Sequence, residues 1–127
     1  MSSDQTVVYV EDDQANRALM ASIFARHFPE LRLDLARNGV EGLDVVTSAS
    51  PRMILLDGYL GDMTASEFII RLRPRMASGL PPIVVVSGSM VPDSATKIEG
   101  VEAHVMKPFK IAELVDLLRP FLGFSTQ

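Results

Sequence analysis

The sequence predicts an α/β protein with a parallel sheet that carries helices on both faces. Short apolar runs alternate along the chain with segments in which apolar residues recur at helical spacing. The first run is uninterrupted and rich in β-branched residues, as expected of a strand buried on both faces. Strands that alternate with helices form right-handed βαβ units, and these units build a parallel sheet between two layers of helices.

Five apolar runs are the predicted strands. Leu31–Ala36 alternates apolar and charged residues, which is typical of a strand nearer the edge of a sheet. Of the other four, three are nearly continuous apolar runs, and the run at 82–86 is the most apolar of all. These four strands are Thr6–Val10, Met53–Leu56, Pro82–Val86 and Val101–Met106.

Helical spacing predicts five helices between and after these strands. Pro29 ends the first, and Pro74 argues for the end of the third. Asp13 is the expected cap of the first helix, and Asp93 that of a short, weak fourth helix. Leu19, Val40 and Ile111 are among the residues assigned to the apolar faces. The predicted ranges are Asn16–Phe28, Val40–Ser48, Thr64–Arg73, Ser94–Glu99 and Lys110–Leu122.

Length and composition limit the classes of function. A chain of 127 residues fits one globular domain, with an ordered core expected from about residue 6 to residue 122. The chain has no cysteine, which excludes a disulfide framework, a thiolate zinc site and a cysteine nucleophile. No apolar stretch approaches the roughly 20 residues that cross a bilayer, so we expect a cytoplasmic protein without membrane contact. The net charge of −4 argues against direct binding to nucleic acid.

Polar side chains follow four of the predicted strands, and the carboxyl ends of parallel strands meet at one edge of a sheet. Three carboxylates at one edge repel each other unless a cation lies among them, and Mg²⁺ prefers such oxygen ligands. An aspartate beside this ion can attack phosphorus and form an acyl phosphate, while a lysine and a hydroxyl neutralise the phosphoryl oxygens. The side chains are Glu11, Asp12 and Asp13 after the first strand, Asp57 after the third, Ser87 after the fourth and Lys107 after the fifth.

Each of these residues also has a simpler explanation when it is taken alone. An acidic triplet is most often a helix cap with favourable dipole charges, and Asp57 alone would more often be a turn residue. Ser87 can begin a loop, and Lys107 can be a solvated surface lysine. The functional interpretation is favoured because an acidic pair, an acid, a hydroxyl and a lysine all follow the appropriate strands of one chain.

Four short stretches carry a resemblance to a known family. They are Val-Glu-Asp-Asp at 10–13 with Arg17 downstream, Ile-Leu-Leu-Asp at 54–57, Val-Val-Ser-Gly at 85–88 and Val-Met-Lys-Pro-Phe at 105–109. Together and in this order, they resemble the receiver domain of two-component response regulators over essentially the whole chain. The resemblance implies a single receiver domain over residues 1–127, with a three-layer, doubly wound, five-stranded parallel sheet of order 2-1-3-4-5, which is the flavodoxin-like arrangement.

The resemblance also implies roles for individual residues. Asp57 would be the phosphoacceptor, and Lys107 and Ser87 would contact the phosphoryl group. Ser87 and His104 would form the switch, with His104 at the position of an aromatic residue that turns inward on activation. The Lys107–Pro108 bond is typically cis in relatives. The implied Mg²⁺ ligands are Glu11 (through water), Asp12 (directly), Asp57 and the backbone carbonyl of Tyr59.

The implied function is a phosphorylation-dependent signalling switch, which catalyses only its own phosphorylation and dephosphorylation. A sensor histidine kinase or a histidine phosphotransfer protein would donate the phosphoryl group. An unidentified downstream effector would read the surface of the fourth helix, fifth strand and fifth helix. We expect a monomer or a weak homodimer. Since the sequence ends soon after the last helix, the chain is expected to be a single-domain regulator or a fragment of a larger protein.

Three departures from the family pattern bear on the switch. Relatives usually read Met-Pro-x-Met-Asp-Gly where this chain has Leu60–Ala65, so we expect a more mobile loop. Gly88 replaces a commoner alanine and is expected to loosen its segment. The stretch between Ser87 and Lys107 is short, so we expect an irregular fourth helix and atypical coupling to the partner surface. Tyr59 places a bulky ring beside Asp57, and we hypothesise that this ring shields the acyl phosphate from water.

Two other functions remain as alternatives. A phosphatase of the haloacid-dehalogenase type is disfavoured because it needs a second aspartate two residues after the nucleophile, where this chain has Tyr59, and a nucleophile after the first strand. A receiver-like interaction module working without phosphorylation is disfavoured by the complete set of site residues, although the three departures keep it open. Nucleotide binding is less favoured still, since no Gly-rich fingerprint follows the first strand.

Overall fold

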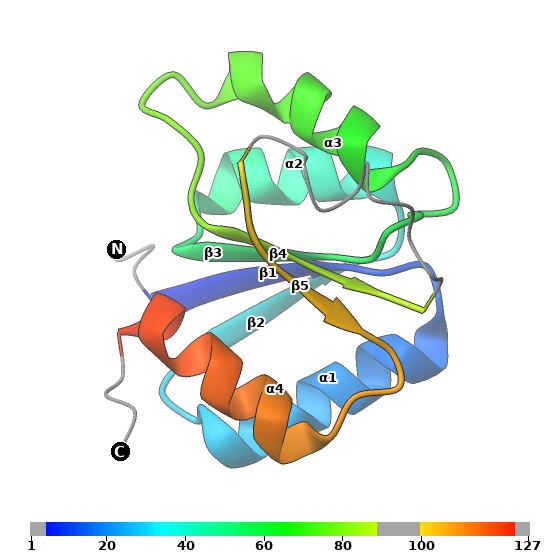
Figure 1. Ribbon diagram of the computed structural model, residues 1–127. Coiled ribbons are helices and arrows are strands. Elements are labelled where there is room, and N and C mark those ends of the chain that lie inside the picture. The colour runs from blue at the N-terminus through cyan, green and yellow to red at the C-terminus, as the bar shows by residue number, and fades with distance from the viewer. Residues whose placement is uncertain (1–4, 89–99, 124–127) are drawn as a thin grey trace.

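The computed structural model describes residues 5–88 and 100–123 and confirms the predicted fold class. Five parallel strands form one sheet in the order β2-β1-β3-β4-β5. Helices α2 and α3 cover one face, and α1 and α4 cover the other (Figure 1). The strands are β1 (Thr6–Val10), β2 (Arg32–Ala36), β3 (Met53–Leu56), β4 (Ile83–Ser87) and β5 (Val101–Met106).

The helices agree with the predicted ranges except at their ends. The predicted helix at 94–99 and its cap Asp93 lie outside the described residues. The last predicted helix is an α-helix only as far as Leu118 and then tightens into a 3₁₀ turn at Arg119–Leu122, because Pro120 has no N–H with which to continue the α-helical pattern. The α-helices are α1 (Gln14–His27), α2 (Gly39–Ala49), α3 (Ala65–Leu72) and α4 (Ile111–Leu118).

The sheet separates two hydrophobic cores. Successive residues of a strand point to opposite faces, so Val8 and Val10 pack with Phe68 beneath α2 and α3. Val7 and Tyr9 face the other way and pack with Phe24 against α1 and α4. Every residue of β1, β3 and β4 is buried, as expected of central strands covered on both sides. This packing fixes the positions of the strand ends.

The predicted burial of Val40 is wrong, and the side chain is 56% exposed. The buried face of α2 is centred on Gly39 and Gly42, and Val40 lies about 100° away from its centre. A Cβ at Gly39 would meet the Met63 side chain at 2.5 Å. The close approach of these glycines to the core therefore determines which face of α2 is buried.

The predicted burial of Leu19 and Ile111 is also wrong, since their side chains are 43% and 42% exposed. Leu19 lies about a quarter of a turn away from the buried stripe of α1. Ile111 is the first residue of α4 and lines the same surface groove as Leu19. These two apolar side chains thus belong to the surface next to the end of β5.

The loop between β3 and α3 is fixed by hydrogen bonds of Asp62 and by the burial of Leu60 and Met63. The Asp62 carboxylate accepts hydrogen bonds from the N–H groups of Gly39 (2.7 Å) and Val40 (3.0 Å), at the start of α2. Leu60 and Met63 are buried, and the Leu60 N–H donates to the Met63 carbonyl at 2.8 Å. The greater mobility expected for this loop stays a prediction, but its anchoring points are now defined.

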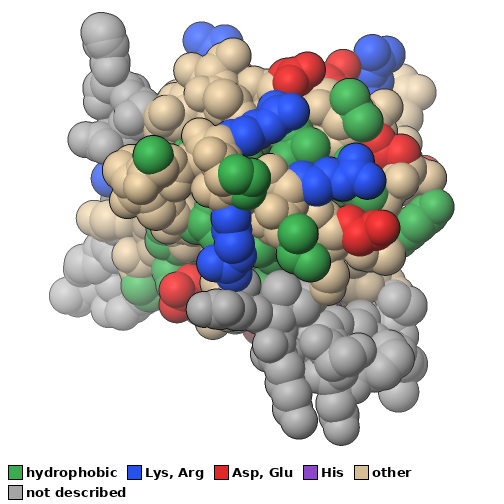
Figure 2. Space-filling view, turned by 90° about the horizontal axis from the view of Figure 1, so that it is seen from above, with side chains coloured by type: hydrophobic (Ala, Val, Ile, Leu, Met, Phe, Trp, Pro, Cys, Tyr) green, Lys and Arg blue, Asp and Glu red, His purple; other side chains and the backbone are tan. Residues whose placement is uncertain are grey.

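Charged side chains of both signs lie on the outer face of α2 and α3. Figure 2 shows Lys and Arg side chains lying among Asp and Glu side chains on this face. Arg75, just beyond α3, pairs with Asp44 of α2 at 3.2 Å, and Arg37 pairs with Glu41 at 3.1 Å. Among residues 5–88 and 100–123, no helix is both long enough and apolar enough to cross a membrane.

Replacement of Asp62 by alanine tests the anchoring of this loop. Asp62→Ala leaves the first N–H groups of α2 without a carboxylate acceptor, so we expect the free energy of unfolding to fall by about 1 kcal/mol. Urea denaturation measures this change. The matched control is Asp116→Ala, which removes an exposed carboxylate 3.9 Å from Arg119 and should change stability by less than about 0.5 kcal/mol. Equal losses in the two variants would contradict the proposed anchoring.

Candidate functional site

Three carboxylates meet at the carboxyl edge of the sheet. Strands β1 and β3 are neighbours, with Val10 opposite Leu56, so the residues that follow them are adjacent. Glu11, Asp12 and Asp57 each offer an oxygen atom, and these atoms all lie within 4.8 Å of one another. Glu11 is buried, Asp57 is half-buried and Asp12 is exposed, which opens the cluster to solvent on one side. The structure thus brings together the acidic residues that the sequence predicts.

Glu11 is a buried carboxylate whose polar atoms are bonded within the protein. Its side chain is only 1% exposed and accepts hydrogen bonds from the Tyr9 hydroxyl (2.9 Å) and Lys107 Nζ (2.8 Å) at Oε1. Its Oε2 accepts from the Asp13 N–H at 3.1 Å. Burial acts to raise the pKa of Glu11, but these hydrogen bonds outweigh it and hold the pKa below its ordinary value. Glu11 is therefore a stable negative charge in the floor of the site.

Lys107 brings positive charge to this cluster from the far side of the sheet. Its backbone N–H donates to the Ser87 carbonyl at 2.8 Å, so the hydrogen bonds between β4 and β5 extend one residue past the end of β5. The Lys107–Pro108 peptide bond is cis, as in the relatives that the sequence resembles. Lys107 Nζ lies 2.8 Å from Glu11 Oε1 and 3.6 Å from Asp57 Oδ1. The lysine is thus bonded to Glu11 and also within ion-pair distance of Asp57.

Asp57 occupies the centre of the cluster. Its N–H donates to the Val10 carbonyl at 3.1 Å, and its Oδ1 accepts from the Gly58 N–H at 2.9 Å. Burial and the neighbouring Glu11 carboxylate raise the pKa of Asp57 to about 6, although Lys107 acts in the opposite direction. Burial, which is the larger cause, and the Glu11 charge together outweigh the effect of Lys107 on this pKa.

Ser87 lies beside the backbone that follows Asp57. It is the last residue of β4 and is only 2% exposed. A Cβ added to Gly58 would lie 2.7 Å from Ser87 Oγ, so the two segments are in close contact. The missing side chain of Gly58 is what allows the serine hydroxyl to approach the Asp57 segment.

Tyr59 and His104 lie at the margins of the site. The Tyr59 side chain is 58% exposed, and its hydroxyl donates to the Gly61 carbonyl at 2.8 Å. Gly61 has a φ of +91°, and a Cβ there would lie 3.2 Å from Asp12 Oδ2, so this loop passes close to the acidic cluster. His104 is half-buried in β5, and its Nε2 is buried without a hydrogen-bond partner among the described residues.

The sequence interpretation assigned no role to two residues of the site. The first is Tyr9, which lies two residues before Glu11 in β1 and therefore on the same face. The second is Arg17, whose Nη1 donates to the Glu11 carbonyl oxygen at 2.8 Å. The two-residue period of the strand could have indicated Tyr9. Arg17 had no comparable signal, because its contact depends on how α1 packs beside the sheet.

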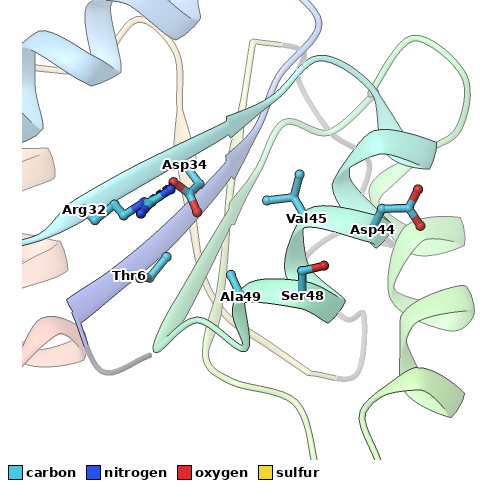
Figure 3. A pocket seen from close by; sticks show the side chains of 7 residues that line it. All are labelled: Thr6, Arg32, Asp34, Asp44, Val45, Ser48 and Ala49. Atoms are coloured by element: carbon cyan, nitrogen blue, oxygen red, sulfur yellow. Dashed lines mark hydrogen bonds and ion pairs between the residues drawn. The ribbon is translucent and has the colours of Figure 1, made fainter. Parts of the chain in front are cut away.

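A separate hollow of about 500 Å³ lies beside the starts of β1 and β2, away from the acidic cluster. Figure 3 shows its side chains, with Arg32 and Asp34 paired at 2.7 Å within it. Arg32 and Asp34 pair with each other, Asp44 pairs with Arg75 outside the hollow, and none of the predicted site residues lines it. The lining residues are Thr6, Arg32, Asp34, Asp44, Val45, Ser48 and Ala49.

The donor set of the acidic cluster fits a hard divalent cation. Three carboxylates face one ammonium group, which leaves an excess of two negative charges when all are ionised. Carboxylate oxygens that converge from rigid strand ends suit Mg²⁺, which takes one or two carboxylates and keeps several waters. Glu11, Asp12 and Asp57 are the residues of the described chain that could hold such an ion.

Comparisons with known proteins find relatives in Bacillus subtilis. The chain is 27% identical over 123 residues to the transcriptional regulatory protein YkoG of Bacillus subtilis, covering 96% of this chain but about half (52%) of YkoG. It is 26% identical to sporulation initiation phosphotransferase F of the same organism, with 97% of this chain and 98% of that protein covered.

A solved structure shares the fold. The receiver domain of Ssk1 from Saccharomyces cerevisiae, in co-crystals with the histidine phosphotransfer signaling protein Ypd1, superposes with a TM-score of 0.79 at 19% identity. The match covers 96% of this chain and 91% of that chain. The family model of the response regulator receiver domain matches residues 7–119, which is most of the sequence. The chain therefore belongs to the receiver-domain family of two-component response regulators.

Proposed function

We propose that this receiver domain accepts a phosphoryl group on Asp57 and thereby changes the surface that a partner protein reads. The observation that carries the proposal is the position of Asp57, next to Glu11 and Asp12 and 3.6 Å from Lys107 Nζ. A nucleophilic carboxylate in such surroundings can receive a phosphoryl group, because Lys107 and a cation held by the carboxylates would offset the negative charge of the transferring group.

The donor is a phosphohistidine of a sensor kinase or a histidine phosphotransfer protein. An Asp57 carboxylate oxygen attacks the phosphorus atom, the phosphorus–nitrogen bond breaks, and the imidazole leaves with its electron pair. The product is an acyl phosphate on Asp57. Lys107 neutralises charge on the phosphoryl oxygens, and the Ser87 hydroxyl, beside Gly58, donates a hydrogen bond to one of them.

Mg²⁺ is the cofactor of this proposal. When bound by Glu11, Asp12, Asp57 and the Tyr59 carbonyl, it offsets the excess negative charge and polarises the phosphoryl oxygens. Glu11 contributes through water, because its Oε1 already accepts from both Tyr9 and Lys107. The ligand set stands on the convergence of the three carboxylates.

The switch follows from new bonds to the phosphoryl oxygens. Moving a domain from mostly inactive to mostly active requires roughly 5.5 kcal/mol of preference for one state. Hydrogen bonds to charged groups contribute about 1.5–3 kcal/mol each, so the contacts of Ser87 and Lys107 supply much of this preference. A shift of Ser87 changes the space beside His104, whose neighbour across the strands is Val85. The altered surface then includes β5 and α4.

An apolar groove beside the site is suited to the phosphoryl donor. The groove has a volume of about 510 Å³ and reaches from α1 to the start of α4, next to Lys107. Leu19 and Ile111 are exposed here although both are large and apolar, which is the usual sign of an interaction surface. A helical partner that docks here would present its phosphohistidine to Asp57. The lining residues are Asn16, Leu19, Gly88, Lys107, Pro108, Phe109 and Ile111.

Beryllofluoride, which mimics a phosphoryl group, tests the site. With Mg²⁺ it should cause a saturable change in the amide NMR spectrum of the wild type, and Asp57→Asn should abolish this change because the acceptor oxygen is lost. The matched control Asp44→Asn removes an exposed carboxylate on α2 and should respond as the wild type does. A wild type that does not respond would favour an interaction module working without phosphorylation.

Substitution in the groove separates docking from chemistry. Leu19→Asp should slow phosphorylation by a phosphohistidine protein at least about tenfold, which corresponds to about 1.4 kcal/mol of lost interaction. Phosphorylation by the small donor acetyl phosphate should not change, since it needs no docking surface. Both rates are measured with ³²P-labelled donors. Val40→Asp, at a more exposed apolar position on α2, is the control and should alter neither rate. Equal slowing with both donors would contradict docking in the groove.

The shielding role of Tyr59 is tested by the lifetime of the acyl phosphate. Tyr59→Asn should accelerate hydrolysis because it removes the ring beside Asp57, whereas Tyr59→Phe keeps the ring and loses only the bond to the Gly61 carbonyl. Loss of label from the isolated phosphoprotein gives both rates. Unchanged hydrolysis in Tyr59→Asn would mean that the ring does not limit the access of water. Acceleration in Tyr59→Phe as well would show that the hydroxyl is needed to fix the ring.

A further inference from the structure

Tyr9 is a buried tyrosine in the middle of the sheet whose hydroxyl reaches the functional site. Its side chain is 1% exposed and packs in the core between the sheet and the layer of α1 and α4. Its hydroxyl donates to Glu11 Oε1 at 2.9 Å. A phenol keeps its proton at neutral pH, so the Tyr9 hydroxyl is the donor of this bond.

Tyr9 shares its acceptor with the lysine of the site. Lys107 Nζ also donates to Glu11 Oε1, at 2.8 Å, while it lies 3.6 Å from Asp57 Oδ1. In this arrangement the lysine is hydrogen-bonded to Glu11 and only within ion-pair distance of Asp57. The ammonium group of Lys107 has three N–H donors, but a shift of Nζ toward a phosphoryl oxygen on Asp57 lengthens and weakens its bond to Glu11.

The free-energy cost of this movement of Lys107 depends on which other donors are hydrogen-bonded to Glu11. A buried carboxylate oxygen that loses a donor is left partly unsatisfied, which is unfavourable in surroundings that exclude water. A tyrosine fixed in the core cannot follow the lysine, so it continues to donate to Oε1 after the lysine has moved. The Glu11 backbone is fixed as well, since its N–H donates to the Ala36 carbonyl at 3.0 Å and its carbonyl accepts from Arg17.

We propose that Tyr9 is a positioning residue which, through its hydroxyl bond to Glu11, frees Lys107 to bond the phosphoryl group on Asp57. This inference rests on the proposed function and adds a residue from the core to the machinery of the switch. Tyr9 acts through Glu11 and touches neither the phosphoryl group nor the cation. Its role is to keep the carboxylate satisfied in the phosphorylated state, in which the lysine is engaged elsewhere.

The variant Tyr9→Phe isolates the hydroxyl, because it keeps the ring and its packing. Within the described part of the chain, Lys107 is then the donor left to Glu11 Oε1, and the lysine is retained there. We expect beryllofluoride, in the presence of Mg²⁺, to bind about tenfold more weakly than to the wild type. Binding of Mg²⁺ alone should not weaken, since Glu11 loses a competing donor. Calorimetry measures the cation, and ¹⁹F NMR measures bound beryllofluoride.

Val7→Ala is the matched control for a loss of stability. Val7 is fully buried in the same strand and faces the same core as Tyr9, but it has no polar contact with Glu11. It should lower the free energy of unfolding while leaving both affinities unchanged. If Val7→Ala weakened beryllofluoride binding as much as Tyr9→Phe does, a general loss of stability would explain the effect and the inference would be overturned.

A double-mutant cycle shows whether Tyr9 acts through Glu11. Glu11→Asp shortens the side chain, so that one carboxylate can no longer reach both donors, and Tyr9→Phe should then have little further effect on beryllofluoride binding. An undiminished tenfold effect in that background would overturn the inference, as would an unchanged affinity in Tyr9→Phe alone. In either case, saturable binding by the wild type would leave the proposed function standing. Absence of such binding in the wild type would overturn both.

Discussion

The crowding of negative charge at one edge of the sheet is the constraint on which the functional site depends. Glu11 and Asp57 are fixed by strand ends that pair through the backbone, so they cannot move apart to relieve their repulsion. Three groups donate hydrogen bonds to the Glu11 carboxylate: Lys107 in the β5–α4 loop, the backbone N–H of Asp13 and the buried Tyr9 hydroxyl. The remaining excess of negative charge is what makes the site receptive to a divalent cation.

Much of this arrangement could be predicted from the sequence, because its signals are local. Continuous apolar runs located β1 and β3 to the residue, and the residues that follow them had to meet once the strands were parallel. The cap at Asp13 was likewise evident from its place before an amphipathic segment, and its side chain accepts from the Asn16 N–H at 2.9 Å. Periodicity and capping chemistry act over a few residues, so they can be read from one chain.

The errors concern features that depend on contacts between distant segments. Val40 has the right spacing for burial, but the approach of Met63 to Gly39 rotates α2 so that Val40 faces outward. By sequence Asp62 is an ordinary loop residue, yet its carboxylate accepts a hydrogen bond from the first N–H of a helix that begins 23 positions earlier. Lys107 could be assigned to the edge of the sheet, whereas its choice of Glu11 over Asp57 as the closer partner depends on distances that a sequence does not contain.

The narrow space at Gly58 has a consequence for protein engineering. Since this residue has no side chain, the backbone that follows Asp57 can touch Ser87 of the neighbouring strand. A β3–α3 connection transplanted from a relative with a larger residue at this point would push that serine outward before any signal arrives. Chimeric receivers built on this scaffold would therefore start from a different resting state, unless the glycine is transplanted with the loop.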